Sequence, residues 1–301
     1  MIKTQEERYI KKYYTYLKFE KNLLPNSIEA YISDVTKLKM FACDHQKELT
    51  TLSAPDITEF LCELHEIGIH PRSQARILSG IKSFYKFLLL DGFITVNPTD
   101  LIEGPKIGRK LPEILSVAEI DLIIQSIDVS TSEGQRNRAI LETLYSCGIR
   151  VSELTGLRIS QIYKNEGFIM VQGKGDKQRI VPIADTALSE IEKYMFYRNE
   201  QFIRKGNEDI LFINRLGTGL SRVMIFNIIR KHCELAGIRK NVSPHTFRHS
   251  FATHLLEGGS NLRAIQLMLG HEKIATTEIY THIDRQFLRE EILTYHPRNK
   301  R

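Results

Sequence analysis

A cluster of helix-breaking residues at 93–112 constrains the fold of this chain more than any other sequence feature. The cluster contains Asn97-Pro98, Gly104-Pro105, Gly108 and Leu111-Pro112. Proline lacks a backbone donor and disfavours helix for the residue before it, so no helix can run through this stretch. We therefore predict a linker at 93–112 between a domain at 1–92 and a larger domain at 113–296, with a basic tail at 297–301.

The first domain has the pattern of four helices. Apolar residues recur at helical spacing within 5–20. Asn26/Glu29 and Asp56/Glu59 have the spacing of capping boxes and predict the starts of two more helices. A fourth helix is expected at 72–91, where one apolar stripe suits a core.

The same fourth helix carries a second stripe of basic and hydroxyl residues, Arg72, Arg76, Ser79, Ser83 and Lys86. Such side chains are typical of a solvated face, but all of them can also donate to phosphate oxygens of DNA. Spacing alone leaves both interpretations open.

The second domain mixes helices with a short β region. Ser116/Glu119 is a further capping box, and a helix at 133–146 should stop at Gly148. Two β-rich runs, 168–171 and 179–183, flank Gly173–Asp176 and predict a hairpin. The pattern from residue 185 onwards is again helical. We predict a mainly α fold with a small β-sheet in the C-terminal domain.

Charge is unevenly distributed along the chain. Residues 1–104 hold 13 Lys+Arg and 14 Asp+Glu, whereas the remainder holds 29 and 22. The basic surplus therefore lies in the C-terminal two thirds and favours a polyanion such as nucleic acid. Apolar runs such as Phe87–Leu90 are far too short to cross a bilayer, and the N-terminus lacks a signal-peptide pattern. We expect a cytoplasmic protein with no membrane partner.

Metal and cofactor sites are not indicated. The four cysteines are widely separated without a C-x-x-C pair, which predicts reduced, packed thiols. His245 and His249 have the spacing of a zinc pair, but Thr246 stands where the H-E-x-x-H pattern needs glutamate. The G-x-x-x-x-G-K-[ST] and G-x-S-x-G patterns are also missing. We expect no metal and no cofactor.

Four polar segments remain, at 147–154, 173–177, 243–249 and 269–282, and together they suit phosphate chemistry. Paired guanidinium groups stabilise the charge that develops on a phosphoryl group without a metal. A tyrosine hydroxyl can attack phosphorus and form a covalent phosphodiester, and a lysine can protonate the leaving oxygen.

In this order the segments resemble the signature of the tyrosine recombinases, the integrase family, and of their Xer subgroup. The matching residues are Arg150 in G-x-R-x-x-E-L, Lys174 in the hairpin, His245 and Arg248 in H-x-x-R, His271 in L-G-H, and Tyr280 nine residues later. The resemblance covers the whole chain, including a SAM-like helical N-terminal domain that clamps DNA.

The resemblance implies site-specific recombination through a 3′-phosphotyrosyl link and a Holliday junction. Tyr280 would be the nucleophile, Arg150, Arg248 and His271 would hold the phosphate, and Lys174 would protonate the leaving oxygen. His245 would assist the tyrosine proton, and Glu153 would orient Arg150. In the Xer subgroup this chemistry resolves chromosome or plasmid dimers during chromosome partition and cell division.

Partners are implied in the same way. The resemblance implies double-stranded DNA with inverted half-sites and a homo- or hetero-tetramer on synapsed DNA, and it allows a second Xer-like recombinase and a DNA translocase. Three alternatives stay open: a mobile-element integrase with the same chemistry, a non-catalytic DNA-binding protein, and a metal-dependent nuclease using His245, His249 and His271.

The tail at 285–301 carries an apolar stripe at helical spacing, Phe287, Leu288, Ile292 and Tyr295, with Glu291 on the same face. It could dock on its own catalytic domain or, as the resemblance also allows, on a neighbouring subunit in a ring.

Overall fold

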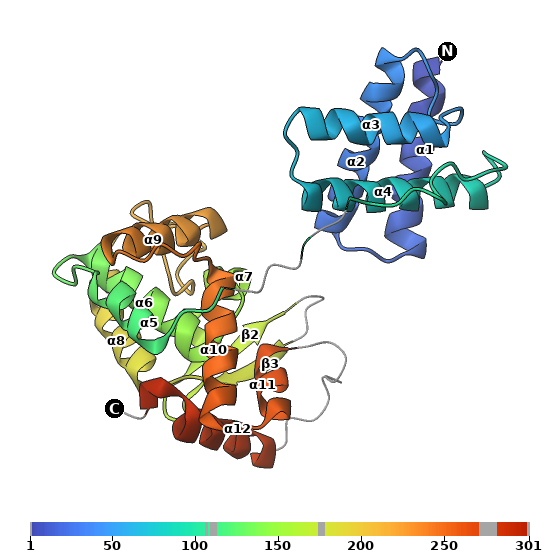
Figure 1. The fold of residues 1–301 in the computed structure, drawn as a ribbon. Coiled ribbons are helices and arrows are strands. Elements are labelled where there is room, and N and C mark those ends of the chain that lie inside the picture. Colours follow the sequence, from blue (N-terminus) through green and yellow to red (C-terminus); the bar gives the residue numbers. More distant parts are fainter. Residues whose placement is uncertain (1, 106–107, 109–112, 174–177, 271–281, 300–301) are drawn as a thin grey trace. The chain divides into compact units, whose positions relative to one another are not determined.

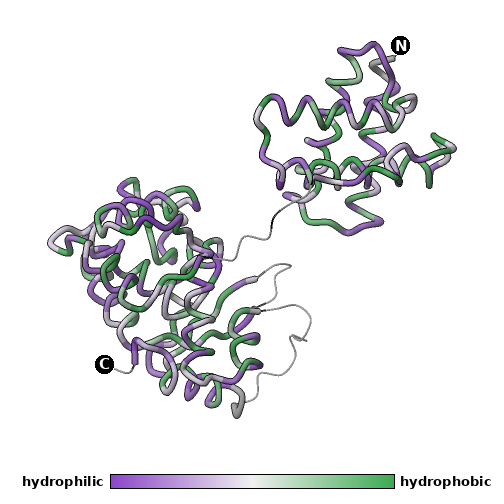
Figure 2. The backbone as a smooth tube through the Cα atoms, viewed as in Figure 1, coloured by the Kyte–Doolittle hydropathy of each residue, from purple (hydrophilic) through white to green (hydrophobic). Residues whose placement is uncertain are grey.

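The computed structural model of the chain describes residues 2–105, 108, 113–173, 178–270 and 282–299. It divides into two compact units, Met1–Lys110 and Leu111–Arg301, each with its own hydrophobic core (Figure 1). Apolar and polar residues interleave along the helices of both units (Figure 2), as helices with one buried face require.

The N-terminal unit contains four α-helices, as predicted. They are α1 (Ile2–Thr15), α2 (Pro25–Asp44), α3 (Ala54–Glu66) and α4 (Pro71–Leu90), and a π-helical turn, Tyr16–Glu20, follows α1. Tyr13, Phe84 and Leu88 are fully buried where these helices pack together. The apolar stripe of α4 therefore forms core, as its spacing indicated.

Two predicted helix starts are wrong. Helix α2 begins at Pro25 after Leu24, so the Asn26/Glu29 pair caps nothing, because proline already occupies the first turn. Helix α3 begins one turn before the predicted Asp56/Glu59 box. The backbone N–H of Ser53 donates to the Asp56 carboxylate at 2.8 Å, so Asp56 is the third residue of the helix rather than its cap.

Residues 93–105 pack onto the N-terminal helices, although the sequence suggests a linker. Ile102 is buried in the same core, and Lys82 Nζ donates to its carbonyl oxygen at 2.7 Å. The Asn97 side-chain oxygen accepts from the N–H of Thr99 at 3.0 Å, which closes a turn around Pro98.

The C-terminal unit is mainly helical with one small sheet, which confirms the predicted fold class. Its helices are α5 (Val117–Gln125), α6 (Ser132–Cys147), α7 (Val151–Thr155), α8 (Asp185–Asn199), α9 (Arg222–Leu235), α10 (Pro244–Gly258), α11 (Leu262–Leu269) and α12 (His282–Tyr295), with short 3₁₀ turns at Ile159–Gln161 and Pro297–Asn299. Ser116 and Glu119 cap α5 as predicted. Among the described helices none is long and apolar enough to span a bilayer.

The sheet has the antiparallel order β1-β2-β3, with β1 at Ile162–Tyr163, β2 at Phe168–Gln172 and β3 at Gln178–Pro182. Val171 pairs with Arg179 and Gln172 with Gln178, which confirms the predicted hairpin. The sequence did not reveal β1, because a strand of two residues is too short to show alternation.

The C-terminal tail packs on its own unit. Leu288 and Ile292 of α12 are buried in the core, and His296 is fully buried against Tyr145 of α6. Arg298, expected in a basic tail, is buried as well. Its guanidinium donates to Glu142 at 2.8 Å and to Asp121 at 2.5 Å.

Replacing Arg298 with methionine should lower the free energy of unfolding by about 3–5 kcal/mol, because Glu142 and Asp121 would lose their buried cation. Burial raises the pKa of Glu142, which means that its charged form is already disfavoured, and Arg298 is the cation that opposes this effect. Urea unfolding followed by circular dichroism measures the change. Arg230→Met, which breaks an exposed pair with Glu234, should cost less than about 1 kcal/mol. Equal losses in the two variants would show that the ion pairs of Arg298 do not anchor the tail.

Candidate active site

Arg150 is positioned by a sharp turn at the end of α6. The helix ends at Gly148, which has a φ of 55°. A Cβ there would lie 2.3 Å from the ring of Phe251 on α10, so both the backbone and the packing require glycine. Two residues later, Arg150 is the N-cap of α7, and its side chain is 39% exposed.

Glu153 holds Arg150 in place from the first turn of α7. Its carboxylate accepts from the backbone N–H of Arg150 at 2.8 Å and from the Arg150 guanidinium at 2.9 Å. The same carboxylate accepts two bonds from Arg179 of β3, at 2.6 and 2.8 Å. Burial opposes ionisation of Glu153, but the bonds from Arg179 and Arg150 outweigh it and lower its pKa. Glu153 is therefore a buried anion shared by two guanidinium groups.

Arg248 approaches the same place from α10. Pro244 opens this helix and Ser243 caps it, which sets Arg248 in its first two turns. The buried guanidinium donates to the Gly148 carbonyl at 2.7 Å and to the Leu269 carbonyl at 2.5 Å. Burial and the nearby Arg150 and Arg179 lower the pKa of Arg248 to about 10. It stays charged at neutral pH.

Three guanidinium groups converge on the C-terminal end of α11. Arg179 Nε donates to Met268 O at 2.9 Å, Arg248 to Leu269 O, and Arg150 to Gly270 O at 3.3 Å. These three consecutive carbonyls form the negative end of the helix dipole. Glu153 is the one carboxylate hydrogen-bonded to these arginines in the described part of the chain. The cluster therefore carries a positive excess and is suited to bind an anion.

The histidines in the described part of the chain do not gather into a metal site. His245, in the first turn of α10, and His249 are both exposed, whereas His254 is buried and bonded through Nδ1 to the Tyr145 hydroxyl at 2.8 Å. No group of three potential metal ligands occurs within the described ranges. His245 lies one turn before Arg248 on the same helix.

Lys174, His271 and Tyr280 lie outside the described residues. Their neighbours in sequence are described. Strands β2 and β3 lead to and from the segment of Lys174, and Gly270, with a φ of 65°, directly precedes His271. The structure thus brings together Arg150, Glu153 and Arg248 of the predicted set.

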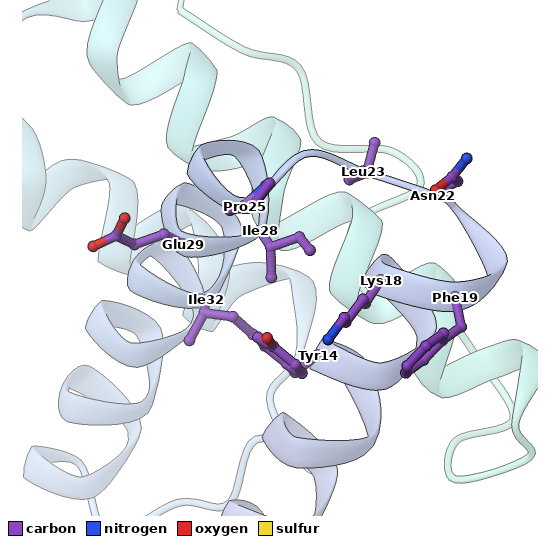
Figure 3. Close-up of a pocket in the computed structure, with 9 residues that line it drawn as sticks. All are labelled: Tyr14, Lys18, Phe19, Asn22, Leu23, Pro25, Ile28, Glu29 and Ile32. Carbon is purple, nitrogen blue, oxygen red and sulfur yellow. The ribbon is translucent and has the colours of Figure 1, made fainter. Parts of the chain in front are cut away.

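The stripe on α4 is accessible but partly engaged. Arg72, Arg76, Ser79 and Lys86 are exposed and Ser83 is half-buried. Both guanidinium N–H groups of Arg76 donate to the fully buried Asp34, so this side chain is fixed on the helix surface. An apolar hollow of about 680 Å³ between the end of α1 and α2 (Figure 3), lined by residues such as Tyr14, Phe19 and Ile28, contains none of the stripe residues.

Arg179, the second partner of Glu153, is a functional residue that no sequence motif identifies. A basic residue within a β-rich run ordinarily points to solvent, so nothing local marks its burial. The β alternation of residues 179–183 was the only available signal, because it places Arg179 on the same face as the buried Val181.

Both units match known families of sequences. Residues 113–286 match the phage integrase family, and residues 10–92 match the phage integrase N-terminal SAM-like domain. Tyrosine recombinase XerD of Chlorobaculum tepidum is 43% identical over 287 residues, which cover 94% of each chain. XerD of Oceanobacillus iheyensis is 41% identical over 292 residues, covering 96% of this chain and 98% of that protein.

Solved structures of recombinases are also similar. The XerA recombinase is 30% identical, with a TM-score of 0.50 over 97% of this chain and 99% of that chain. The XerH site-specific recombinase, in a post-cleavage complex with a palindromic difH substrate, has a TM-score of 0.71 over 91% of this chain and 81% of that chain. At 24% identity, the likeness to XerH shows the fold alone.

Replacing Glu153 with glutamine should destabilise the catalytic unit by on the order of 3 kcal/mol at pH 7, because two guanidinium groups would lose their shared anion. The folded pKa of Glu153 is lowered, so its contribution is complete above the unfolded value of about 4.3 and is lost as pH falls through the folded pKa. Urea titrations of both proteins from pH 7 to pH 3 should show the difference shrinking in acid. A difference independent of pH would mean that the charge of Glu153 is not what stabilises the unit.

Proposed function

Since this chain belongs to the phage integrase family of tyrosine recombinases, we propose that it cuts and rejoins DNA at a specific site with Tyr280 as its nucleophile. It is a site-specific DNA recombinase of the Xer type, and its XerD-named relatives match nearly its whole length. A mobile-element role and a non-catalytic role are not favoured by these relatives.

One observation carries the proposal for the site: Arg150, Arg179 and Arg248 converge around the single carboxylate of Glu153. Such a cluster is costly unless an anion completes it. A phosphodiester is the anion that the geometry suits, because the Arg150 side chain is 39% exposed and a guanidinium has further N–H donors beyond those bonded to Glu153 and Gly270.

The proposed reaction is a pair of transesterifications. The Tyr280 oxygen attacks the scissile phosphorus while the bond to the 5′ oxygen breaks, which leaves a 3′-phosphotyrosyl link and a 5′-hydroxyl. The 5′-hydroxyl of the partner strand then attacks the link and releases Tyr280, passing through a Holliday junction. The number of phosphodiester bonds is conserved, so the chemistry needs no ATP, and the fixed arginine cations supply the charge stabilisation that other phosphoryl-transfer enzymes obtain from a metal.

The remaining residues have roles in moving protons and holding charge. Lys174 donates the proton that the leaving 5′ oxygen takes up, and His245 assists removal of the tyrosine proton. His271 holds the phosphate together with Arg150 and Arg248. Two observations support this assignment. His245 lies one turn before Arg248 on α10. Arg150 donates to the carbonyl of Gly270, the residue that precedes His271 in the sequence.

The DNA partner is double-stranded, with inverted half-sites around a short spacer, and four subunits assemble on two synapsed sites. The stripe of Arg72, Arg76, Ser79, Ser83 and Lys86 on α4 lies against its phosphates. We propose a role in resolving chromosome or plasmid dimers, with a second Xer-like recombinase and a DNA translocase as further partners.

Replacing Tyr280 with phenylalanine removes only a hydroxyl, so DNA binding should survive while covalent attachment to a nicked suicide substrate disappears. Denaturing gel electrophoresis of the protein–DNA adduct measures this. Tyr295→Phe is the matched control, because Tyr295 packs near Gly259 at the end of α10, and it should still form the adduct. An adduct formed by Tyr280→Phe would identify another nucleophile.

Arg150→Ala and Arg248→Ala should each slow cleavage roughly 100- to 1,000-fold at saturating DNA, because the transition state loses a fixed cation.

Lys174→Ala should cleave ordinary DNA slowly but regain cleavage on a substrate in which sulfur replaces the 5′ bridging oxygen, because a thiolate leaves without a proton. Single-turnover rates on both substrates compare the three variants. Equal rescue of Arg150→Ala by sulfur would refute the separate role of Lys174.

A further inference from the structure

Arg179 is a buried cation on β3, which pairs with β2. Its side chain is 8% exposed, and its guanidinium makes three hydrogen bonds: two to the Glu153 carboxylate and one to the Met268 carbonyl. Within the described residues these bonds reach two neighbouring elements, so the buried guanidinium acts as a cross-link between them and β3.

These contacts join three elements, each of which lies within a few residues in sequence of a proposed catalytic residue. Arg179 belongs to β3 and follows Lys174 by five residues. Glu153 lies in the first turn of α7 and binds both the backbone and the side chain of Arg150. Met268 lies in the last turn of α11, three residues before His271.

We infer that Arg179 is a positioning residue for strand cleavage, which holds Glu153 against Arg150 and fixes the last turn of α11. This inference rests on the proposed function, because it assigns Arg179 a part in that same reaction. Arg179 itself touches no reacting atom. Without it, Glu153 keeps only its bonds to Arg150, and the guanidinium of Arg150 can turn away from the phosphate.

Lysine cannot replace this residue. The contact uses two parallel N–H groups toward one carboxylate and a third N–H, Nε, toward a carbonyl in a different direction. An ammonium group supplies a point charge without this planar fork. A role limited to charge would be restored by Arg179→Lys, whereas a positioning role would not.

The same unit offers a matched control in Arg198 of α8, which is 2% exposed. Its guanidinium donates to the carbonyls of Asn207, Glu208, Ile210 and Leu211, all in one loop. Arg198→Met therefore removes an equally buried guanidinium without touching Glu153, Arg150 or α11.

The test compares Arg179→Met, Arg179→Lys and Arg198→Met in the full chain. Half-site DNA affinity is measured by gel shift, and the single-turnover cleavage rate is measured on a suicide substrate at saturating DNA. We expect both Arg179 variants to bind DNA within about threefold of the wild type but to cleave roughly 100-fold more slowly, because a small misplacement of Arg150 is enough for such a loss. Arg198→Met should cleave at nearly the wild-type rate once folded and bound.

Cleavage by Arg179→Lys at the wild-type rate, or equal losses in Arg179→Met and Arg198→Met, would overturn the inference. A double-mutant cycle of Arg179→Met and Arg150→Ala in urea unfolding decides the coupling without any activity. Losses in the free energy of unfolding that are not additive support the inference, and additive losses overturn it. Arg179→Gln replaces Arg179→Met in the cycle if the methionine variant does not fold. Failure of the proposed function would appear instead as a wild-type protein that forms no covalent adduct.

Discussion

The rest of the C-terminal unit depends on the hydrogen-bonded ion pairs that the buried carboxylate of Glu153 forms. It is shared by Arg150 and Arg179, and through them it joins α7, β3 and the end of α11. Arg150 is a neighbour of Glu153 in sequence, but Arg179 and Met268 come from distant parts of the chain, so the full set of contacts forms only when all three elements have folded. A buried anion of this kind stabilises one arrangement strongly and penalises every arrangement that breaks it.

The helix α6 links this charge cluster to the C-terminal tail. At the end of α6, the carbonyl of Gly148 accepts a hydrogen bond from Arg248, and the left-handed backbone of Gly148 turns the chain toward Arg150. Three residues earlier, the Tyr145 ring packs against the buried His296 of the tail in a tilted arrangement, with the ring centroids 4.8 Å apart. Burial lowers the pKa of His296 to about 3, so the ring stays neutral near neutral pH, with Nδ1 accepting from the backbone N–H of Arg298 at 3.2 Å and Nε2 3.3 Å from the Tyr145 carbonyl. Loss of tail packing would therefore disturb the helix that positions the arginines.

Features set by neighbouring residues could be predicted from the sequence. The stop of α6 at Gly148 needs a left-handed residue, and the hairpin follows from two β-rich runs around a glycine-rich turn. Arg150 and Glu153 are three residues apart, so their contact within one helical turn is also a local matter. The prediction that these residues act in catalysis came from the family resemblance rather than from spacing.

Features set by distant residues could not be predicted. The pair of Arg298 with Glu142 joins positions 156 residues apart, and neither residue has a local pattern that indicates burial. Arg179 lies in a β-rich run that would be equally regular with its side chain in solvent. Its burial is stable only because Glu153 and the carbonyl of Met268 face it, and both reach it through tertiary packing. A cation that is unfavourable in its own strand thus becomes favourable through its surroundings, and such conflicts between local and global preference are typical of functional sites.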